Sequence, residues 1–240
     1  MPIEPPAPPW LLPDVRRARP GQELVAVGAE LTPGMLLAGY RAGLFPMPDA
    51  GQLGWWSPDP RGILWPAQVH VARSLLRSSR RFEVSRDLAF AEVVAACADP
   101  RRPLGWISDP YRAAYQGLHE LGWAHSVEVW DDAGRLVGGL FGVEVGGLFA
   151  AESKFHRATD ASKVAVLALA DLLAGDGRPE RLIDVQWRTA HLARLGVVEV
   201  PRVEYLALAA RARALPPVLS RPPGDQGAEG RPSRIRWRMA

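Results

Sequence analysis

The 240-residue sequence is poor in cysteine and in long apolar runs. Cys97 is the only cysteine, so neither an internal disulfide nor a cysteine-built metal site can form. The five histidines lack paired spacing, and we expect no metal. No apolar run reaches the roughly 18 residues of a membrane helix, and MPIEPPAPPWLLPD does not resemble a signal peptide. We therefore predict a soluble, cytoplasmic monomer without a membrane partner.

Nucleotide-cofactor and serine-nucleophile motifs are also missing. The chain has no Walker loop and no G-x-G-x-x-G segment after a strand, which removes the usual nucleotide-cofactor hypotheses. It has no G-x-S-x-G turn either, so a serine triad has no support. The sequence thus points away from the common cofactor-dependent enzymes.

Lysine is scarce as well, because only Lys154 and Lys163 are lysines among 29 basic residues. The net charge is only +3, so a nucleic-acid site has to be argued from position. In VARSLLRSSRRF the spacing puts Arg73, Arg77 and Arg80 on one helical face, with Arg81 alongside. This face is a candidate phosphate-binding track, and a plain solvated face is the open alternative.

Proline and glycine divide the chain into segments. Residues 1–20 and 216–240 are rich in proline, and we predict that both are disordered. The tail holds a cluster of Arg234, Arg236 and Arg238. Between the two ends we expect a small N-terminal domain over residues 21–64 and a catalytic domain over residues 65–215.

Helix and strand patterns interleave along the middle of the chain. Thr32 and Pro33 predict the start of a helix that ends at Gly43, and residues 44–66 read as an irregular loop. The segments AHSVEVW, RLVGGLFGVEV and GGLFAAES alternate with period two and predict an antiparallel meander. Four more segments read as helices and two as strands: VARSLLRSSRRF, DLAFAEVVAACA, DPYRAAYQGLHELG and DASKVAVLALADLLAG, then LIDVQW and, after a short helix in AHLARLG, VVEVP. The order predicts a mixed α/β fold with a largely antiparallel sheet.

The strand LIDVQW carries the clearest chemical signal. Its period places Asp184 and Gln186 on one face, and a carboxylate inside a short apolar strand must be paired or solvated. Glu152 ends another apolar strand, so the two carboxylates could line one cleft. Asp184 could accept a proton or hold an amine there. A structural salt bridge for Asp184 and a surface position for Glu152 stay open.

Several tryptophans fall outside the periodic segments. Trp106, in GWISDP before a helix, is a candidate for stacking on an RNA base. Trp55, Trp56 and Trp65 could equally close a domain junction.

Six motifs together resemble the leucyl/phenylalanyl-tRNA-protein transferases. They are ELTPGMLLAGYRAGLFP, WWSPDPRGILWP, LHELGWAHSVEVW, LVGGLFGVEVGGLFAAESKF, DASKVAVLAL and LIDVQW, and they cover about residues 20–214 in unbroken order. The resemblance implies a C-terminal domain like the Gcn5-related N-acetyltransferases. It also implies transfer of Leu or Phe, with Met as a further candidate, from tRNA to proteins that begin with Arg or Lys, which marks them for degradation. No cofactor is implied.

The resemblance assigns roles to individual residues. It implies that Asp184 and Gln186 are catalytic and that Glu152 and Asp184 contact the acceptor. Trp106 and Met47, which stands where the family usually has tryptophan, would lie against the terminal adenosine of the tRNA. The implied aminoacyl pocket is lined by Leu140, Phe149 and Ile183. Lys154 departs from the usual methionine beside that pocket.

The implied chemistry needs only positioning and proton handling, because an aminoacyl ester is already activated. We expect Asp184 to orient the acceptor amine and receive or relay its proton, while Gln186 holds the amine or donates to the oxyanion. The tRNA ribose hydroxyl could share the proton transfer. Two rival functions are a CoA-dependent N-acetyltransferase, against which the missing pyrophosphate-binding turn counts, and a noncatalytic tRNA-binding protein.

Overall fold

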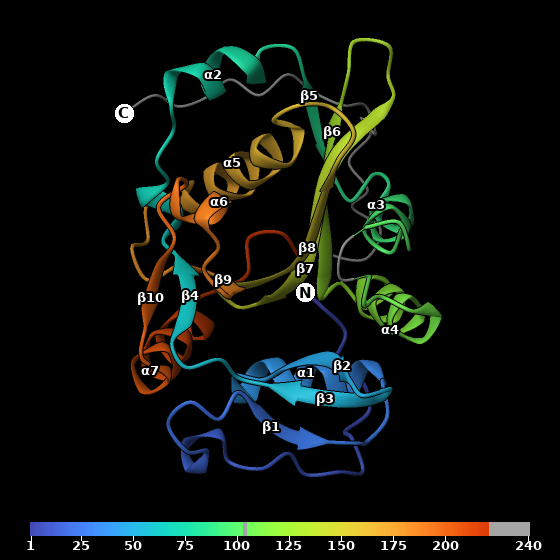
Figure 1. Ribbon diagram of the computed structural model, residues 1–240, viewed down its shortest axis with the longest axis vertical. Coiled ribbons are helices and arrows are strands. Elements are labelled where there is room, and N and C mark those ends of the chain that lie inside the picture. The colour runs from blue at the N-terminus through green and yellow to red at the C-terminus, as the bar shows by residue number, and fades with distance from the viewer. Residues whose placement is uncertain (103–104, 221–240) are drawn as a thin grey trace.

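The computed structural model describes residues 1–102 and 105–220, which form a small sheet and a large sheet with helices around them (Figure 1). The small sheet has the strand order β1-β3-β2, with β1 (Leu24–Val27), β2 (Phe45–Asp49) and β3 (Gln52–Trp56). The helix α1 (Pro33–Ala42) packs against it, between this sheet and the rest of the molecule.

The large sheet contains seven strands in the order β10-β4-β9-β8-β7-β6-β5. Its strands are β4 (Arg61–Leu64), β5 (Glu83–Arg86), β6 (Ala124–Trp130), β7 (Leu136–Val145), β8 (Leu148–His156), β9 (Leu182–Gln186) and β10 (Val198–Val200). The pair β8–β9 is parallel, and the other described pairs are antiparallel. The predicted mixed α/β fold, the largely antiparallel sheet and the meander of β6, β7 and β8 are confirmed.

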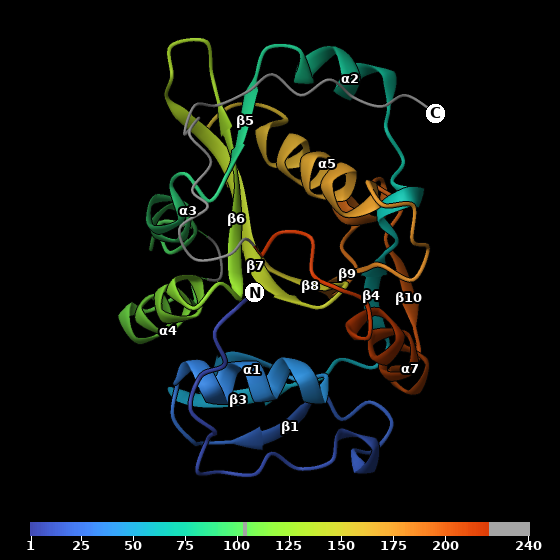
Figure 2. The same ribbon diagram turned by 180° about the vertical axis from the view of Figure 1, so that it is seen from behind.

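Helices cover both faces of the large sheet (Figures 1 and 2). One face packs against α5 (Ala161–Ala174), and the other packs against α3 (Phe90–Cys97) and α4 (Asp109–Glu120). Beyond α5 lies α2 (Arg73–Ser79), while α6 (Ala190–Ala193) and α7 (Arg202–Arg213) flank the β9, β4 and β10 side. Two short 3-10 helices cover Val15–Arg17 and Pro66–Gln68.

The predicted ends of α1 are confirmed by their hydrogen bonds. The Thr32 hydroxyl accepts a bond from the Met35 amide at 3.2 Å, which satisfies one free donor of the first turn. Gly43 ends the helix at φ 83°, a left-handed conformation that costs glycine nothing. This helix places Tyr40 in the interior, where the candidate site lies.

The expected loop over residues 44–66 is wrong, because this segment forms β2, β3 and β4. Ala50 and Gly51 both have positive φ angles, and they make the two-residue turn of a β2–β3 hairpin. Pro46 and Pro48 lie in β2, which is an edge strand and therefore tolerates residues that cannot donate. The strand β4, which ends at residue 64, pairs within the large sheet. The domain boundary predicted after residue 64 stays a prediction.

Further elements had no prediction. They are β1, β5 and α7, of which the first two are four-residue edge strands without a clear alternation. The helix α2 is also shorter than the segment VARSLLRSSRRF from which it was predicted.

Described residues of both proline-rich ends contact the body of the protein. The Ile3 amide donates to the Leu121 carbonyl at 2.8 Å, and Glu4 accepts a bond from Arg41 at 2.9 Å. Near the other end, Leu219 is buried. The predicted disorder of both segments stays a prediction, and Arg234, Arg236 and Arg238 lie outside the described residues.

Candidate active site

The candidate site lies where β8 and β9 separate. The two strands pair from Leu148–Leu182 as far as Ala150–Asp184 and then diverge. Just beyond this point Glu152 has no partner in β7, because Ala151 pairs with Gly142 and Ser153 pairs with Phe141. An extra residue of this kind is a β-bulge, which redirects side chains and is common next to active sites.

The neighbouring strand β9 is irregular at the same level. Val185 is skipped in its pairing with β4, where Ile63 pairs with Asp184 and Gly62 pairs with Gln186. Gln186 has φ 60°, which is unusual for a residue with a side chain. Two irregular strand ends therefore face one gap, and each carries a predicted site residue.

Asp184 is fully bonded inside the protein. Its carboxylate accepts bonds from Arg61 Nε at 2.8 Å and Nη2 at 2.6 Å, and both side chains are 1% exposed. The Tyr205 hydroxyl donates to Oδ2 at 2.8 Å. The backbone N–H of Gln186 donates to Oδ1 at 3.0 Å, so Asp184 also holds the left-handed backbone of Gln186. Removing this carboxylate would leave a buried guanidinium without its counter-charge, which is costly.

Gln186 points its amide nitrogen toward two carbonyl oxygens, those of Val185 and Ala151, each at 3.0 Å. An amide NH₂ group has two donors, and both are used here. With both donors used, the side-chain oxygen of Gln186 is the group left to accept a hydrogen bond. The bond to Ala151 also ties Gln186 to the residue before Glu152.

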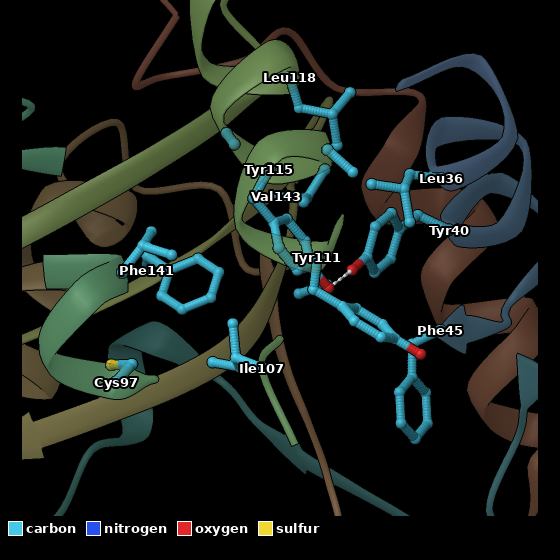
Figure 3. Close-up of a cluster of buried hydrophobic side chains, with 14 of the residues drawn as sticks. Leu36, Tyr40, Phe45, Cys97, Ile107, Tyr111, Tyr115, Leu118, Phe141 and Val143 are labelled. Atoms are coloured by element: carbon cyan, nitrogen blue, oxygen red, sulfur yellow. Dashed lines mark hydrogen bonds between the residues drawn. The ribbon is translucent and has the colours of Figure 1, made fainter. Parts of the chain in front are cut away.

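Glu152 reaches into a cluster of tyrosines (Figure 3 shows the rings of Tyr40, Tyr111 and Tyr115). The Tyr115 hydroxyl donates to Oε2 at 2.7 Å and lies 2.8 Å from the Tyr40 hydroxyl. Glu152 as a residue is partly exposed, but its Oε1 is buried and has no hydrogen-bond partner among the described residues. Burial raises the pKa of Glu152 to about 7, while the bond from Tyr115 and the nearby Tyr40 hydroxyl lower it.

Tyr111 and Trp106 complete one side of this cluster. The Trp106 ring stands edge to face with Tyr111 at 5.3 Å and with Tyr115 at 6.5 Å. The Tyr111 hydroxyl is buried without a partner among the described residues. Burial, and then the charge of Glu152, raise the pKa of Tyr111 to about 12. Trp106 is only partly buried, so a ring of the site reaches the surface.

The three residues of the implied aminoacyl pocket lie in the core that packs against α5. Leu140, Phe149 and Ile183 are each at most 1% exposed, and Phe149 pairs with Ile183 across β8 and β9. Lys154 pairs with Leu140 on the neighbouring strand and is partly buried. Burial, and then the charge of Arg102, lower the pKa of Lys154. The lysine therefore adjoins this group.

The residues predicted to bind tRNA lie in separate places. Met47 is in β2, partly buried against the same core cluster as Trp106. Three arginines line a groove of about 210 Å³ on α2 together with Leu76; they are Arg73, Arg77 and Arg80. Arg81 donates to Ser78 at 2.9 Å instead.

Several residues of the site carried no prediction from the sequence. Arg61, Tyr205 and the tyrosine cluster had no predicted role. Tyr111 and Tyr115 are four residues apart on one face of α4, a spacing that could have signalled a shared site. Arg61 gave no such signal, since its partner is 123 residues away.

The described residues contain neither a candidate metal site nor a candidate membrane span. Within residues 1–102 and 105–220, no group of three or more His, Cys, Asp and Glu residues could hold a metal ion. No helix in these ranges has the length and apolarity needed to cross a bilayer.

Carboxylates, an amide and aromatic rings thus lie together where β8 and β9 separate, and such groups are suited to bind a ligand that carries amines and rings. Comparison with known protein families identifies the family of the chain. The family model described as leucyl/phenylalanyl-tRNA protein transferase matches residues 63–210, and the model of its N-terminal domain matches residues 29–59. The chain therefore belongs to the leucyl/phenylalanyl-tRNA protein transferase family and is an aminoacyltransferase.

Individual relatives agree with this assignment. A leucyl/phenylalanyl-tRNA–protein transferase of Aromatoleum aromaticum is 51% identical over 210 residues, which cover 83% of this chain and 87% of the relative. One from Nitratidesulfovibrio vulgaris is 46% identical over 236 residues, which cover 95% and 92%. Among solved structures, a GCN5-related N-acetyltransferase from Kribbella flavida matches 70% of this chain and 60% of its own, with a TM-score of 0.35 and 13% identity.

Proposed function

We propose that the protein transfers leucine or phenylalanine, and also methionine, from aminoacyl-tRNA to an N-terminal Arg or Lys of an acceptor protein. The product is a new peptide bond, and the added residue marks the acceptor for degradation. The observation that carries the proposal is Oε1 of Glu152, which is buried without a hydrogen-bond partner among the described residues and lies near the Arg61–Asp184 pair, in a chain of this family. An unpaired buried carboxylate oxygen favours a cationic group.

The acceptor site is built from Glu152, Gln186 and the tyrosines. We propose that Glu152 contacts the cationic end of the acceptor directly. Asp184 contributes its negative charge and holds the Gln186 backbone through the 3.0 Å bond to Oδ1. Because both Asp184 oxygens are already bonded to Arg61 and Tyr205, its main role in this proposal is positioning.

The donor site takes the aminoacyl end of the tRNA. Leu140, Phe149 and Ile183 form the apolar floor for the leucyl or phenylalanyl side chain, which suits a ligand pocket lined by apolar groups. Trp106 and Met47 are the proposed contacts of the terminal adenosine. The groove with Arg73, Arg77 and Arg80, with Arg81 beside it, is the proposed contact for tRNA phosphates.

The reaction replaces an ester by an amide. The acceptor amine attacks the ester carbonyl carbon, the C–N bond forms, and the bond to the ribose oxygen breaks. A free α-amine has a pKa of about 7.7 to 8.0, so it must lose a proton before it can attack. The residues of the site then supply position and a place for the second proton that the nitrogen loses.

The donor can be identified by offering one acceptor and several donors. Purified protein is mixed with a peptide that begins with Arg and with labelled Leu-tRNA, Phe-tRNA, Met-tRNA or acetyl-CoA, and the label in the peptide is measured. The proposal predicts transfer from Leu-tRNA and Phe-tRNA and none from acetyl-CoA. Transfer only from acetyl-CoA would show an acetyltransferase, and tRNA binding without any transfer would show a noncatalytic protein.

A further inference from the structure

The site holds two carboxylates in contrasting surroundings. Asp184 is paired with Arg61 and has bonds to both oxygens. Glu152 uses one oxygen for Tyr115 and leaves the other buried and unpartnered among the described residues. Two acids held so differently are suited to different tasks: one to fix geometry, the other to exchange a proton.

We infer that Glu152, through Oε1, is the general base that takes the proton from the attacking amine and returns it to the departing ribose oxygen. This inference rests on the proposed function and assigns its proton transfer to a residue of this chain. The neutral amine attacks the ester carbon and gives a tetrahedral intermediate with a positive nitrogen and a negative oxygen. Glu152 removes a proton from the nitrogen, the intermediate collapses, the C–O bond breaks, and the ribose oxygen leaves with that proton.

Three structural features support the assignment. The β-bulge turns Glu152 toward the tyrosines and away from the regular ladder. The amide of Gln186 reaches the Ala151 carbonyl, so the group that holds the amine adjoins the base. Oε2 is fixed by Tyr115, whose hydroxyl is supported by Tyr40, and only Oε1 is left to act.

The charged and titratable groups around Glu152 come from four elements. They are Tyr40 on α1, Tyr111 and Tyr115 on α4, Arg61 on β4 and Asp184 on β9. Burial holds the pKa of Glu152 at about 7, close to that of an α-amine, and the matched values favour proton transfer in both directions.

The experiment measures single-turnover transfer from Leu-tRNA to an Arg-starting peptide with wild-type protein and Glu152→Gln, at saturating acceptor across pH 5.5 to 9. We expect the maximal rate of the variant to fall about 10² to 10⁴-fold, the range for loss of a general base. The melting temperature and tRNA affinity of the variant are measured alongside. A loss confined to the acceptor KM, with an unchanged maximal rate, would overturn the inference and leave Glu152 as a binding residue.

A second variant protects the test against misfolding. Tyr115→Phe removes a bond that lowers the pKa of Glu152, so the rate inflection of Glu152 should move to higher pH. The inflection of the acceptor amine should not move. Identical profiles for wild type and Tyr115→Phe would overturn the inference. If wild-type protein transfers nothing from any aminoacyl-tRNA, the proposed function itself has failed.

Discussion

Arg61 and Asp184 form a two-bond ion pair that is buried on both sides, with each side chain 1% exposed. The pair joins β4 to β9 beside the gap between β8 and β9. The Arg61 guanidinium also lies over two aromatic rings. Its Cζ atom is 4.5 Å from the ring centre of Tyr205 and 5.0 Å from that of Phe45. Residues from the small sheet, the large sheet and α7 thus meet at one charge.

Breaking this pair should cost both stability and activity. We predict that Asp184→Asn lowers the free energy of unfolding by about 3 to 5 kcal/mol, because it leaves Arg61 buried without a counter-charge. Turnover should be almost abolished, since the NH₂ group of Asn would face the donors Arg61 Nη2 and the Tyr205 hydroxyl and disturb the pair that positions Gln186. Denaturant titration and a transfer assay measure the two effects, and tRNA affinity should change little.

A matched control lies elsewhere in the fold. Asp176 makes a similar two-bond pair with Arg181, whose side chain is also 1% exposed. Asp176→Asn should lower stability while the turnover per folded molecule stays near wild type. Full activity in Asp184→Asn would remove Asp184 from the catalytic machinery.

The stability of the protein should depend on pH through Glu152. Its pKa is raised from 4.5 to about 7 in the folded state, so the folded protein binds a proton that the unfolded chain has already released. This contribution is most favourable below pH 4.5, declines as the pH rises to 7, and then stays constant.

The difference amounts to on the order of 3 kcal/mol. Glu152→Gln should remove it, and urea titrations at several pH values compare the two proteins. Parallel pH curves for wild type and variant would show that Glu152 is not buried as a titrating acid.

The groove on α2 makes a prediction about RNA binding. Reversing Arg73, Arg77 and Arg80 to Glu should weaken tRNA binding and reduce the slope of log affinity against log salt by about 2 to 3, close to one per lost phosphate contact. The control reverses the exposed residues Arg16, Arg17 and Arg19 at the 3-10 helix Val15–Arg17, which changes the charge equally. If both triple variants behave alike, the effect comes from net charge, and the groove is an ordinary solvated face.

Most of what could be predicted about the fold was predicted from local sequence pattern. The period of two in β6, β7, β8 and β9 and the capping residues of α1 were readable because they depend on neighbours in the chain. The β2–β3 hairpin was missed because its prolines disfavour a strand unless the strand is an edge, which only the tertiary structure shows.

The candidate site was readable in its acids and in part of its aromatics. Asp184 in an apolar strand and Glu152 at a strand end broke local preference, which drew attention to them. Their environments were not readable: Arg61 and Tyr40 reach the site from distant segments. The bulge at Glu152 depends on the pairing register, which a single strand does not disclose.

For Glu144 the local sequence predicts the wrong environment. A position beside a glycine-rich turn predicts solvent exposure, yet Glu144 is 1% exposed. Its carboxylate accepts bonds from the backbone amides of Val218, Leu219 and Ser220 at 2.7 to 3.1 Å. The partners lie more than 70 residues away, so the sequence near Glu144 contains no sign of them.

This contact gives a stability prediction. Glu144→Ala should lower the free energy of unfolding by on the order of 3 kcal/mol, because it strands buried amide donors. Cleavage by protease between residues 214 and 220 should become faster than in wild type. Glu180→Ala, at an exposed position, serves as the control. Equal protease sensitivity in both variants would show that Glu144 does not hold residues 218–220 in place.

The central claim is tested most directly by competition among acceptors. One reaction contains the protein, labelled Leu-tRNA and equal amounts of peptides that begin with Arg, Lys or Ala, and mass spectrometry counts the leucylated products. We expect leucine on the Arg and Lys peptides and almost none on the Ala peptide, because the carboxylates of the site favour a cationic side chain at the first residue of the acceptor. Equal labelling of all three, or none of any, would contradict it.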